Sequence, residues 1–166
     1  MFRIEDVQAL GNLVVADIIK TDVVTVTSTT PLIEIIRIFR DRNFEGIPVV
    51  DNGILKGVAM RRELLNFYVI PSRDLDEGDT RKLFQLVSMM DIQQPVSDFM
   101  KSEPLTVAPD CKVSRLAQLM MENDLFSFPV VRIKRTFLRK EKKLFIGIIT
   151  LTDMMPLLYE AICCES

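Results

Sequence analysis

The segment Gly46-Ile47-Pro48-Val49-Val50 has a close echo 81 residues later in Ser127-Phe128-Pro129-Val130-Val131. The same offset pairs Val15-Ala16-Asp17-Ile18-Ile19-Lys20 with Val96-Ser97-Asp98-Phe99-Met100-Lys101. Further along the chain the offset becomes 90, because the second copy carries a nine-residue insertion. Self-similarity at a fixed spacing predicts one structural unit that is present twice.

Each copy is predicted to fold as β-α-β-β-α. The β-branched run that includes Val23, Val24 and Val26 favours a strand, and Thr30 with Pro31 is typical of a helix start. The next helix has apolar residues at i, i+3, i+4 and i+7 in both copies. These residues are Leu32, Ile35, Ile36 and Phe39, and Val113, Leu116, Ala117 and Met120.

The second half of each copy is predicted to be a hairpin and a helix. Asp51-Asn52-Gly53 favours a tight turn between two strands, because these residue types tolerate a positive φ. The final helix is expected to begin near Met60 in the first copy and near Thr150 in the second. The expected organisation is a segment 1–11, repeat 12–70, an acidic loop with a short linker helix 71–94, repeat 95–160 with a basic hairpin 132–143, and a tail 161–166.

The composition argues against several classes of function. The 166 residues are 48% apolar and carry a net charge of −2, so no basic excess indicates a nucleic-acid partner. The chain has no histidine, and its three cysteines lack the spacing of a metal site, which argues against an enzyme and against a bound metal. The longest apolar stretch, 144–151, is far shorter than the roughly 20 residues of a spanning helix, so we expect a cytoplasmic protein without membrane contact.

A seven-residue segment near the end of the second copy, Gly147-Ile148-Ile149-Thr150-Leu151-Thr152-Asp153, resembles the Gly-x-x-Ser/Thr-x-x-Asp signature of CBS domains. Within a doubled β-α-β-β-α pattern, the chain is similar to a tandem CBS domain pair, or Bateman module. The resemblance implies an α/β (α+β) fold with two repeats packed in pseudo-two-fold symmetry. It also implies clefts that bind AMP, ADP, ATP or S-adenosylmethionine as a regulatory ligand, with no required cofactor.

The resemblance also implies which residues hold the ligand. Asp153 would accept the ribose hydroxyls near a helix start at Thr150, because a carboxylate offers two acceptor oxygens. The expected adenosyl site comprises Asp22, Val23, Val24, Gly46, Ile47, Pro48, Ile148, Thr150 and Asp153, with Arg61, Arg62, Arg132 and Lys134 as phosphate contacts. Thr150 and Asp153 also have the spacing of a capping box, which would serve the helix without any ligand.

The first copy departs from the signature, because Met60 and Glu63 stand where the family has a hydroxyl and an aspartate. We therefore expect a weaker second cleft, built from Glu63, Pro104, Leu105 and Pro129. The basic hairpin 132–143 is either a solvated strand edge, a phosphate-gathering arm or a docking surface for an acidic partner. The leading hypothesis is a homodimeric sensor that signals to an unknown effector protein. The alternative is a ligand-free dimerisation or protein-interaction module.

Overall fold

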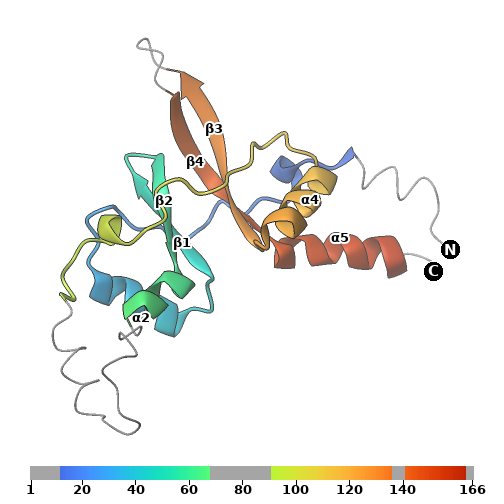
Figure 1. Cartoon of the computed structure of the whole chain (residues 1–166). Coiled ribbons are helices and arrows are strands. Elements are labelled where there is room, and N and C mark those ends of the chain that lie inside the picture. The colour runs from blue at the N-terminus through green and yellow to red at the C-terminus, as the bar shows by residue number, and fades with distance from the viewer. Residues whose placement is uncertain (1–11, 68–90, 136–140, 164–166) are drawn as a thin grey trace, which may run out of the picture. The chain divides into compact units, whose positions relative to one another are not determined.

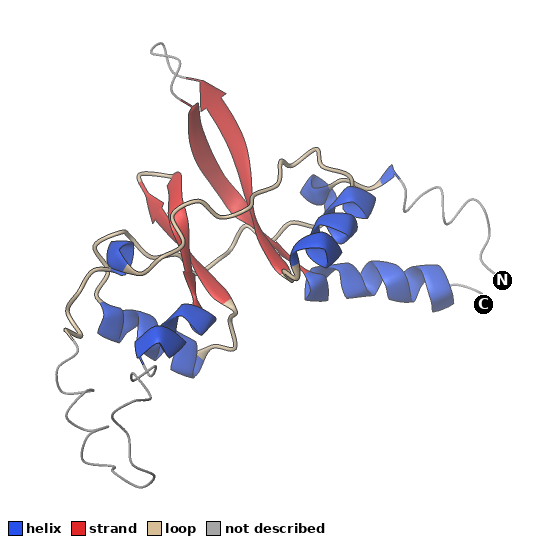
Figure 2. Cartoon of the chain, in the orientation of Figure 1, coloured by secondary structure: helices blue, strands red, loops and turns tan. Residues whose placement is uncertain are grey.

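The computed structural model describes residues 12–67, 91–135 and 141–163 (Figure 1). The chain mixes helices with antiparallel strands, which confirms the predicted α+β class (Figure 2). The elements in order are η1 (Val15–Asp17), α2 (Leu32–Asp41), β1 (Gly46–Asp51), β2 (Ile54–Met60), η2 (Arg61–Phe67), η3 (Val96–Asp98), α4 (Val113–Asn123), β3 (Ser127–Arg135), β4 (Glu141–Thr150) and α5 (Leu151–Cys163). The expected segment 1–11, the acidic loop and most of the linker helix lie outside the described residues. Of the expected tail 161–166, residues 161–163 are the end of α5 and the rest lie outside the described residues.

The chain forms two compact units, and each unit takes residues from both sequence copies. Unit 1 contains the described parts of Met1–Val24, Asn52–Leu55 and Pro104–Ser166, and unit 2 contains those of Thr25–Asp51 and Lys56–Glu103. The opening segment of each copy therefore packs with the rest of the other copy. In unit 1, for example, the Val15 N–H donates to the Cys111 carbonyl at 2.9 Å.

The two cores are built from aligned residues, which explains why the repeat is visible in the sequence. Val15 and Val96 are both fully buried, the first in the core of unit 1 and the second in that of unit 2. Three of the four residues in each predicted helix stripe are buried, whereas Ile36 and Ala117 are half-buried. The core of unit 1 further includes Val113, Leu116, Met120, Phe128, Val130 and Ile149, and that of unit 2 includes Ile35, Phe39, Ile47, Val49 and Ala59.

Two hairpins supply the strands. At the turn between β1 and β2, Asn52 and Gly53 adopt φ values of 50° and 76°, as the sequence predicts. β3 and β4 pair from Ser127 opposite Thr150 to Arg135 opposite Glu141. Within unit 1, β4 also pairs with the start of β2, where Ile54 lies opposite Leu144.

Three local features differ from the expectation. The strand expected at residues 23–26 is reduced to one parallel bridge between Val26 and Val49, because only Val26 finds backbone partners there. α2 begins at Leu32 with Pro31 as its N-cap, while the Thr30 hydroxyl accepts the Thr27 N–H instead of capping the helix. Up to Phe67, where this described range ends, the first copy has the 3-10 helix η2 in place of the expected α-helix, whereas α5 has 13 residues.

Glycine at 147 permits a close backbone contact in unit 1. A Cβ placed on Gly147 would lie 2.1 Å from the Lys20 carbonyl oxygen, a distance that no side chain tolerates. Gly57 repeats the arrangement in unit 2, where a Cβ would lie 2.7 Å from the Lys101 carbonyl oxygen. The two glycines stand at aligned positions of the repeat, and each contacts the opening segment of the other copy.

We expect Gly147→Ala to lower the free energy of unfolding by about 1–3 kcal/mol, because the backbone of the opening segment must move. Urea unfolding followed by circular dichroism measures the change. The control is Gly53→Asn, at a position with open space and a positive φ that asparagine tolerates, where we expect little change. Equal stability of Gly147→Ala and the parent would contradict the close contact.

Candidate functional site

Asp153 lies in the first turn of α5, and one of its oxygens is engaged by the helix start. Asp153 Oδ2 accepts the Thr150 N–H at 2.8 Å and the Thr150 hydroxyl at 2.7 Å. Thr150 directly precedes α5, and Asp153 is the third residue of that helix. A carboxylate at this position binds free N–H groups and the positive end of the helix dipole. These bonds hold the carboxylate in one orientation.

The second oxygen of Asp153 carries an ion pair with Lys20. Lys20 Nζ contacts Asp153 Oδ1, although the Lys20 side chain is 62% exposed and that of Asp153 only 4%. The lysine backbone is fixed, because Lys20 and Ile148 exchange two hydrogen bonds of 3.0 Å each. Sequence reasoning assigned no role to Lys20. The signal that could have found it is the lysine at the same place in both copies.

The surroundings of Asp153 act on its pKa in opposite directions. Burial raises the pKa, whereas the hydrogen bonds from Lys20 and from the Thr150 hydroxyl and N–H lower it. The charge of Lys20 lowers it as well, and the net result is an Asp153 pKa below the usual aspartate value. The carboxylate is therefore ionised and can accept hydrogen bonds from hydroxyl groups.

The other predicted site residues of unit 1 follow Lys20 along the chain or precede Thr150. Asp22 and Val24 are exposed, and Val23 and Ile148 are half-buried. The Lys20–Ile148 backbone pair thus places Lys20 beside the signature segment 147–153, and residues 22–24 follow it along the chain. Main-chain groups and apolar side chains are both available there.

The remaining residues of the expected adenosyl site belong to unit 2. Gly46, Ile47 and Pro48 lie on β1, where Ile47 is fully buried in the core. The Pro48 carbonyl accepts the Val26 N–H at 3.1 Å. This part of the expected site is therefore also part of the packing of unit 2.

The two arginines at the start of η2 have partners within unit 2. The Arg61 guanidinium donates to the Asn43 side chain at 3.0 Å and to the Arg42 carbonyl at 3.1 Å, and it lies 5.6 Å from the ring centre of Phe39. Arg62 forms an ion pair of 3.6 Å with Glu63. Arg61 thus contacts the last turn of α2 and the residues that follow it, a role that the sequence did not indicate.

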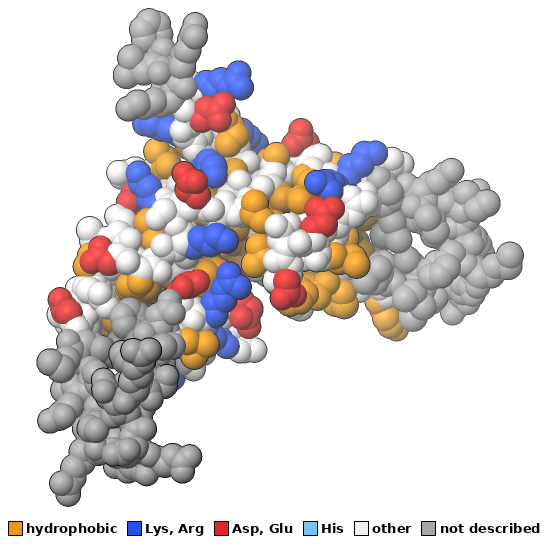
Figure 3. Space-filling view, viewed as in Figure 1, with side chains coloured by type: hydrophobic (Ala, Val, Ile, Leu, Met, Phe, Trp, Pro, Cys, Tyr) orange, Lys and Arg blue, Asp and Glu red, His pale blue; other side chains and the backbone are white. Residues whose placement is uncertain are grey.

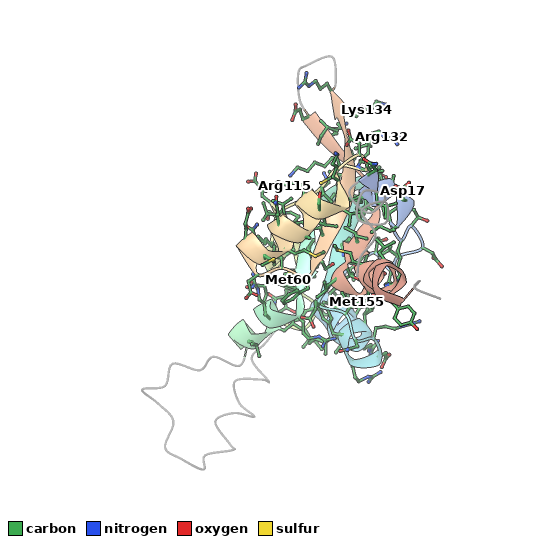
Figure 4. All side chains as sticks on the ribbon, turned by 90° about the vertical axis from the view of Figure 1, so that its right-hand side faces the viewer. Asp17, Met60, Arg115, Arg132, Lys134 and Met155 are labelled. Carbon is green, nitrogen blue, oxygen red and sulfur yellow. The ribbon has the colours of Figure 1, made fainter. Side chains whose placement is uncertain are left out.

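The basic side chains of the β3–β4 hairpin lie along its arm. Figure 4 shows Arg132 and Lys134 on the hairpin, well separated from Met155 on α5. Because Ser127 pairs with Thr150, Arg132 and Lys134 lie about 17 Å and 23 Å along the strand from the start of α5, at about 3.3 Å per residue. The phosphate contacts expected of Arg132 and Lys134 therefore remain a prediction.

The residues expected to form the weaker cleft are divided between the units. Glu63 belongs to unit 2, whereas Pro104, Leu105 and Pro129 belong to unit 1. Leu105 is exposed and Pro129 is buried on β3. Among the residues that the structure describes, no group of acidic or cysteine side chains could hold a metal ion.

The chain belongs to the CBS domain family. The family model matches residues 15–70 and 96–160, so both sequence copies are CBS domains. Proteins with CBS domains are typically regulatory rather than catalytic. Within the described ranges, no helix has the length and apolar character needed to cross a membrane.

Known proteins share the sequence pattern and the fold. The CBS domain-containing protein YhcV of Bacillus subtilis is 26% identical over 140 residues, which are 84% of this chain and 81% of that protein. The structure of CBSX2 in complex with AMP matches with a TM-score of 0.63 and 22% identity, over 89% of this chain and 96% of that one. The CBS domain pair of MJ0100, in complex with 5′-methylthioadenosine and S-adenosylmethionine, matches with a TM-score of 0.58 and 20% identity, over 88% and 99% of the chains.

The lowered pKa of Asp153 predicts a pH-dependent part of the stability. A group whose pKa falls on folding contributes stability that is present above its ordinary pKa of about 3.9 and is lost as the pH falls through the folded value. The difference in free energy of unfolding between the parent and Asp153→Asn should therefore be constant above about pH 5 and shrink below about pH 4. Urea unfolding across this range measures it.

A repeat of this series in about 1 M salt is the control, because salt screens the exposed Lys20 charge but leaves the Thr150 hydrogen bonds in place. A difference that stays constant down to pH 3 would show that ionised Asp153 gains nothing from its partners.

Proposed function

We propose that this chain is a regulatory module that binds an adenosine-containing ligand at Asp153 and signals its presence to a partner protein. The observation that carries the proposal is the state of the Asp153 carboxylate. Asp153 is nearly buried and oriented by Thr150, yet its Oδ1 is reached by a lysine that extends from the surface. The helix cap uses only Oδ2, so Oδ1 is left for a partner from outside the helix, which in this structure is Lys20.

The chemistry around Asp153 suits an adenosyl ligand. Oδ1 can accept hydrogen bonds from the 2′ and 3′ hydroxyls of a ribose. The start of α5 favours a negatively charged group. The backbone and apolar side chains of Val23 and Ile148 suit a purine ring. AMP in CBSX2 and the two adenosyl ligands of MJ0100 support this class of ligand.

The second candidate function is a CBS module that uses no ligand and serves dimerisation or protein interaction. The hydrogen bonds from Thr150 to Asp153 Oδ2 favour it, because they are those of a helix cap. The two functions differ in one measurable property, the affinity for adenosyl compounds. In either case the chain acts through a partner and performs no catalytic step.

Asp153→Asn tests the ligand site. Asparagine keeps the size of the side chain and some of its capping ability, but it removes the charge that would hold the ribose. Because a hydrogen bond to a charged group contributes about 1.5–3 kcal/mol, we expect the affinity for AMP or S-adenosylmethionine to fall about ten- to a hundred-fold. Isothermal titration calorimetry measures this affinity.

Glu63→Gln is the matched control, since it makes the same change at the aligned acid of the first copy, and we expect it to alter the affinity little. If both variants bind like the parent, Asp153 is a helix cap only. If the parent gives no heat with any adenosyl compound, Asp153 is again a helix cap only. The second candidate function, the interaction module, then applies.

We further propose that two copies pair through an apolar surface of unit 1. Hydrophobic side chains gather near the start of α5 (Figure 3). Met121 at the end of α4 is 86% exposed, and Phe126 and Met155 are also exposed. The sequence predicts an exposed pairing surface at Ile38, Leu119 and Met121, the apolar residues outside the helix stripes. Ile38 and Leu119 pack against the cores of their own units, so only Met121 fits this prediction.

Met121→Asp tests the pairing. We expect the parent to sediment as a dimer at micromolar concentration and Met121→Asp to sediment mainly as a monomer, because a charge would be buried in an apolar contact. Ile133→Asp is the control, since Ile133 is also exposed but lies on the hairpin arm. A monomeric parent contradicts the pairing.

A further inference from the structure

The ion pair between Lys20 and Asp153 occupies the oxygen that a ribose would use. Asp153 Oδ2 already accepts two hydrogen bonds from Thr150. Oδ1 carries the Lys20 ammonium. A ligand that binds Asp153 through its ribose hydroxyls must therefore displace this ammonium or share the oxygen with it.

The lysine can move its ammonium without moving its backbone. The two hydrogen bonds with Ile148 and the close contact over Gly147 fix the Lys20 main chain. The side chain itself is mostly exposed and has a flexible four-carbon stem. When it leaves Asp153, the ammonium stays next to the site and has lost its anion.

We propose that Lys20 selects adenosine 5′-phosphates over uncharged or cationic adenosyl ligands, by exchanging its ion pair with Asp153 for one with the phosphate. This inference rests on the proposed function, because it assumes that Asp153 binds the ribose. Adenosine displaces the ammonium and gives it no new anion. The sulfonium of S-adenosylmethionine places a positive charge near it, whereas a phosphate supplies negative oxygens.

Unit 2 provides a matched lysine, which comes from the second copy. Lys101 aligns with Lys20, and its backbone exchanges hydrogen bonds of 2.9 and 3.0 Å with Val58. Lys101 also lies over a glycine, Gly57, as Lys20 lies over Gly147. The aligned acid there is Glu63, which has an ion pair with Arg62. The same substitution at 20 and at 101 therefore separates an effect at the site from an effect of losing a lysine at this place in the fold.

The experiment measures the affinities of the full chain and of Lys20→Met, Lys20→Arg and Lys101→Met for AMP and for adenosine by isothermal titration calorimetry. We expect the parent to prefer AMP over adenosine by about ten- to a hundred-fold, as one charge-assisted contact allows. In Lys20→Met this ratio should fall to near one, because AMP binding weakens while adenosine binding stays equal or improves. Lys20→Arg and Lys101→Met should keep the preference of the parent.

The outcomes distinguish this inference from the proposed function. An equal loss of AMP and adenosine affinity in Lys20→Met, or an unchanged ratio, overturns the selection by Lys20 and leaves the adenosyl site in place. A parent that binds neither compound overturns both proposals.

Lys20→Met leaves the carboxylate without its ion pair, so thermal melting accompanies the titration. If Lys20→Met does not fold, the comparison moves to Lys20→Arg with the double variant Lys20→Met/Asp153→Asn, which has no unpaired carboxylate. A preference for AMP in that double variant equal to the parent's overturns the inference.

Discussion

The backbone pair between Lys20 and Ile148 is the constraint on which the geometry of unit 1 depends. It joins the opening segment of the first copy to a strand of the second, and Gly147 makes the approach possible because it has no side chain. The same pair recurs in unit 2 between Lys101 and Val58 over Gly57. The core of unit 1 contains Val15 from the first copy, and the core of unit 2 contains Val96 from the second copy. Neither copy therefore buries its apolar surface with its own residues alone.

This constraint places a cation beside a nearly buried carboxylate. Burying an aspartate is costly unless its charge is compensated, and here Thr150 and Lys20 together supply the compensation. The two partners differ in kind. The Thr150 bonds are local to the helix start, whereas the Lys20 side chain is mostly exposed, so its ammonium regains hydration when it leaves Asp153. The ammonium can therefore be exchanged for another partner while the Thr150 bonds stay in place.

The sequence predicted the features that repeat with a fixed period. The helix stripes, the turn at Asn52 and Gly53 and the place of Asp153 at a helix start follow from residue type and spacing. The exchange of opening segments was not predicted, because periodicity shows which residues are buried but not which copy covers them. The ion pair of Lys20 and the contacts of Arg61 were missed for a related reason. The partner of a charged residue outside a periodic pattern is set by the tertiary fold, because the two groups are far apart in the sequence and close only in the folded chain.

The two copies share a scaffold but differ at the acid. Glycine, valine and the paired lysine stand at aligned positions in both, since the same close contacts recur in both units. At the helix start, Thr150 and Asp153 are replaced by Met60 and Glu63, and the helix that follows is a short 3-10 helix in place of α5. Thr150 and Asp153 would support α5 even without a ligand, so their presence alone does not indicate binding. The cap uses Oδ2, whereas Oδ1 is paired with Lys20 from the other copy, so the exchange of this ion pair for ribose hydroxyls is the step by which a structural carboxylate would also become a binding one.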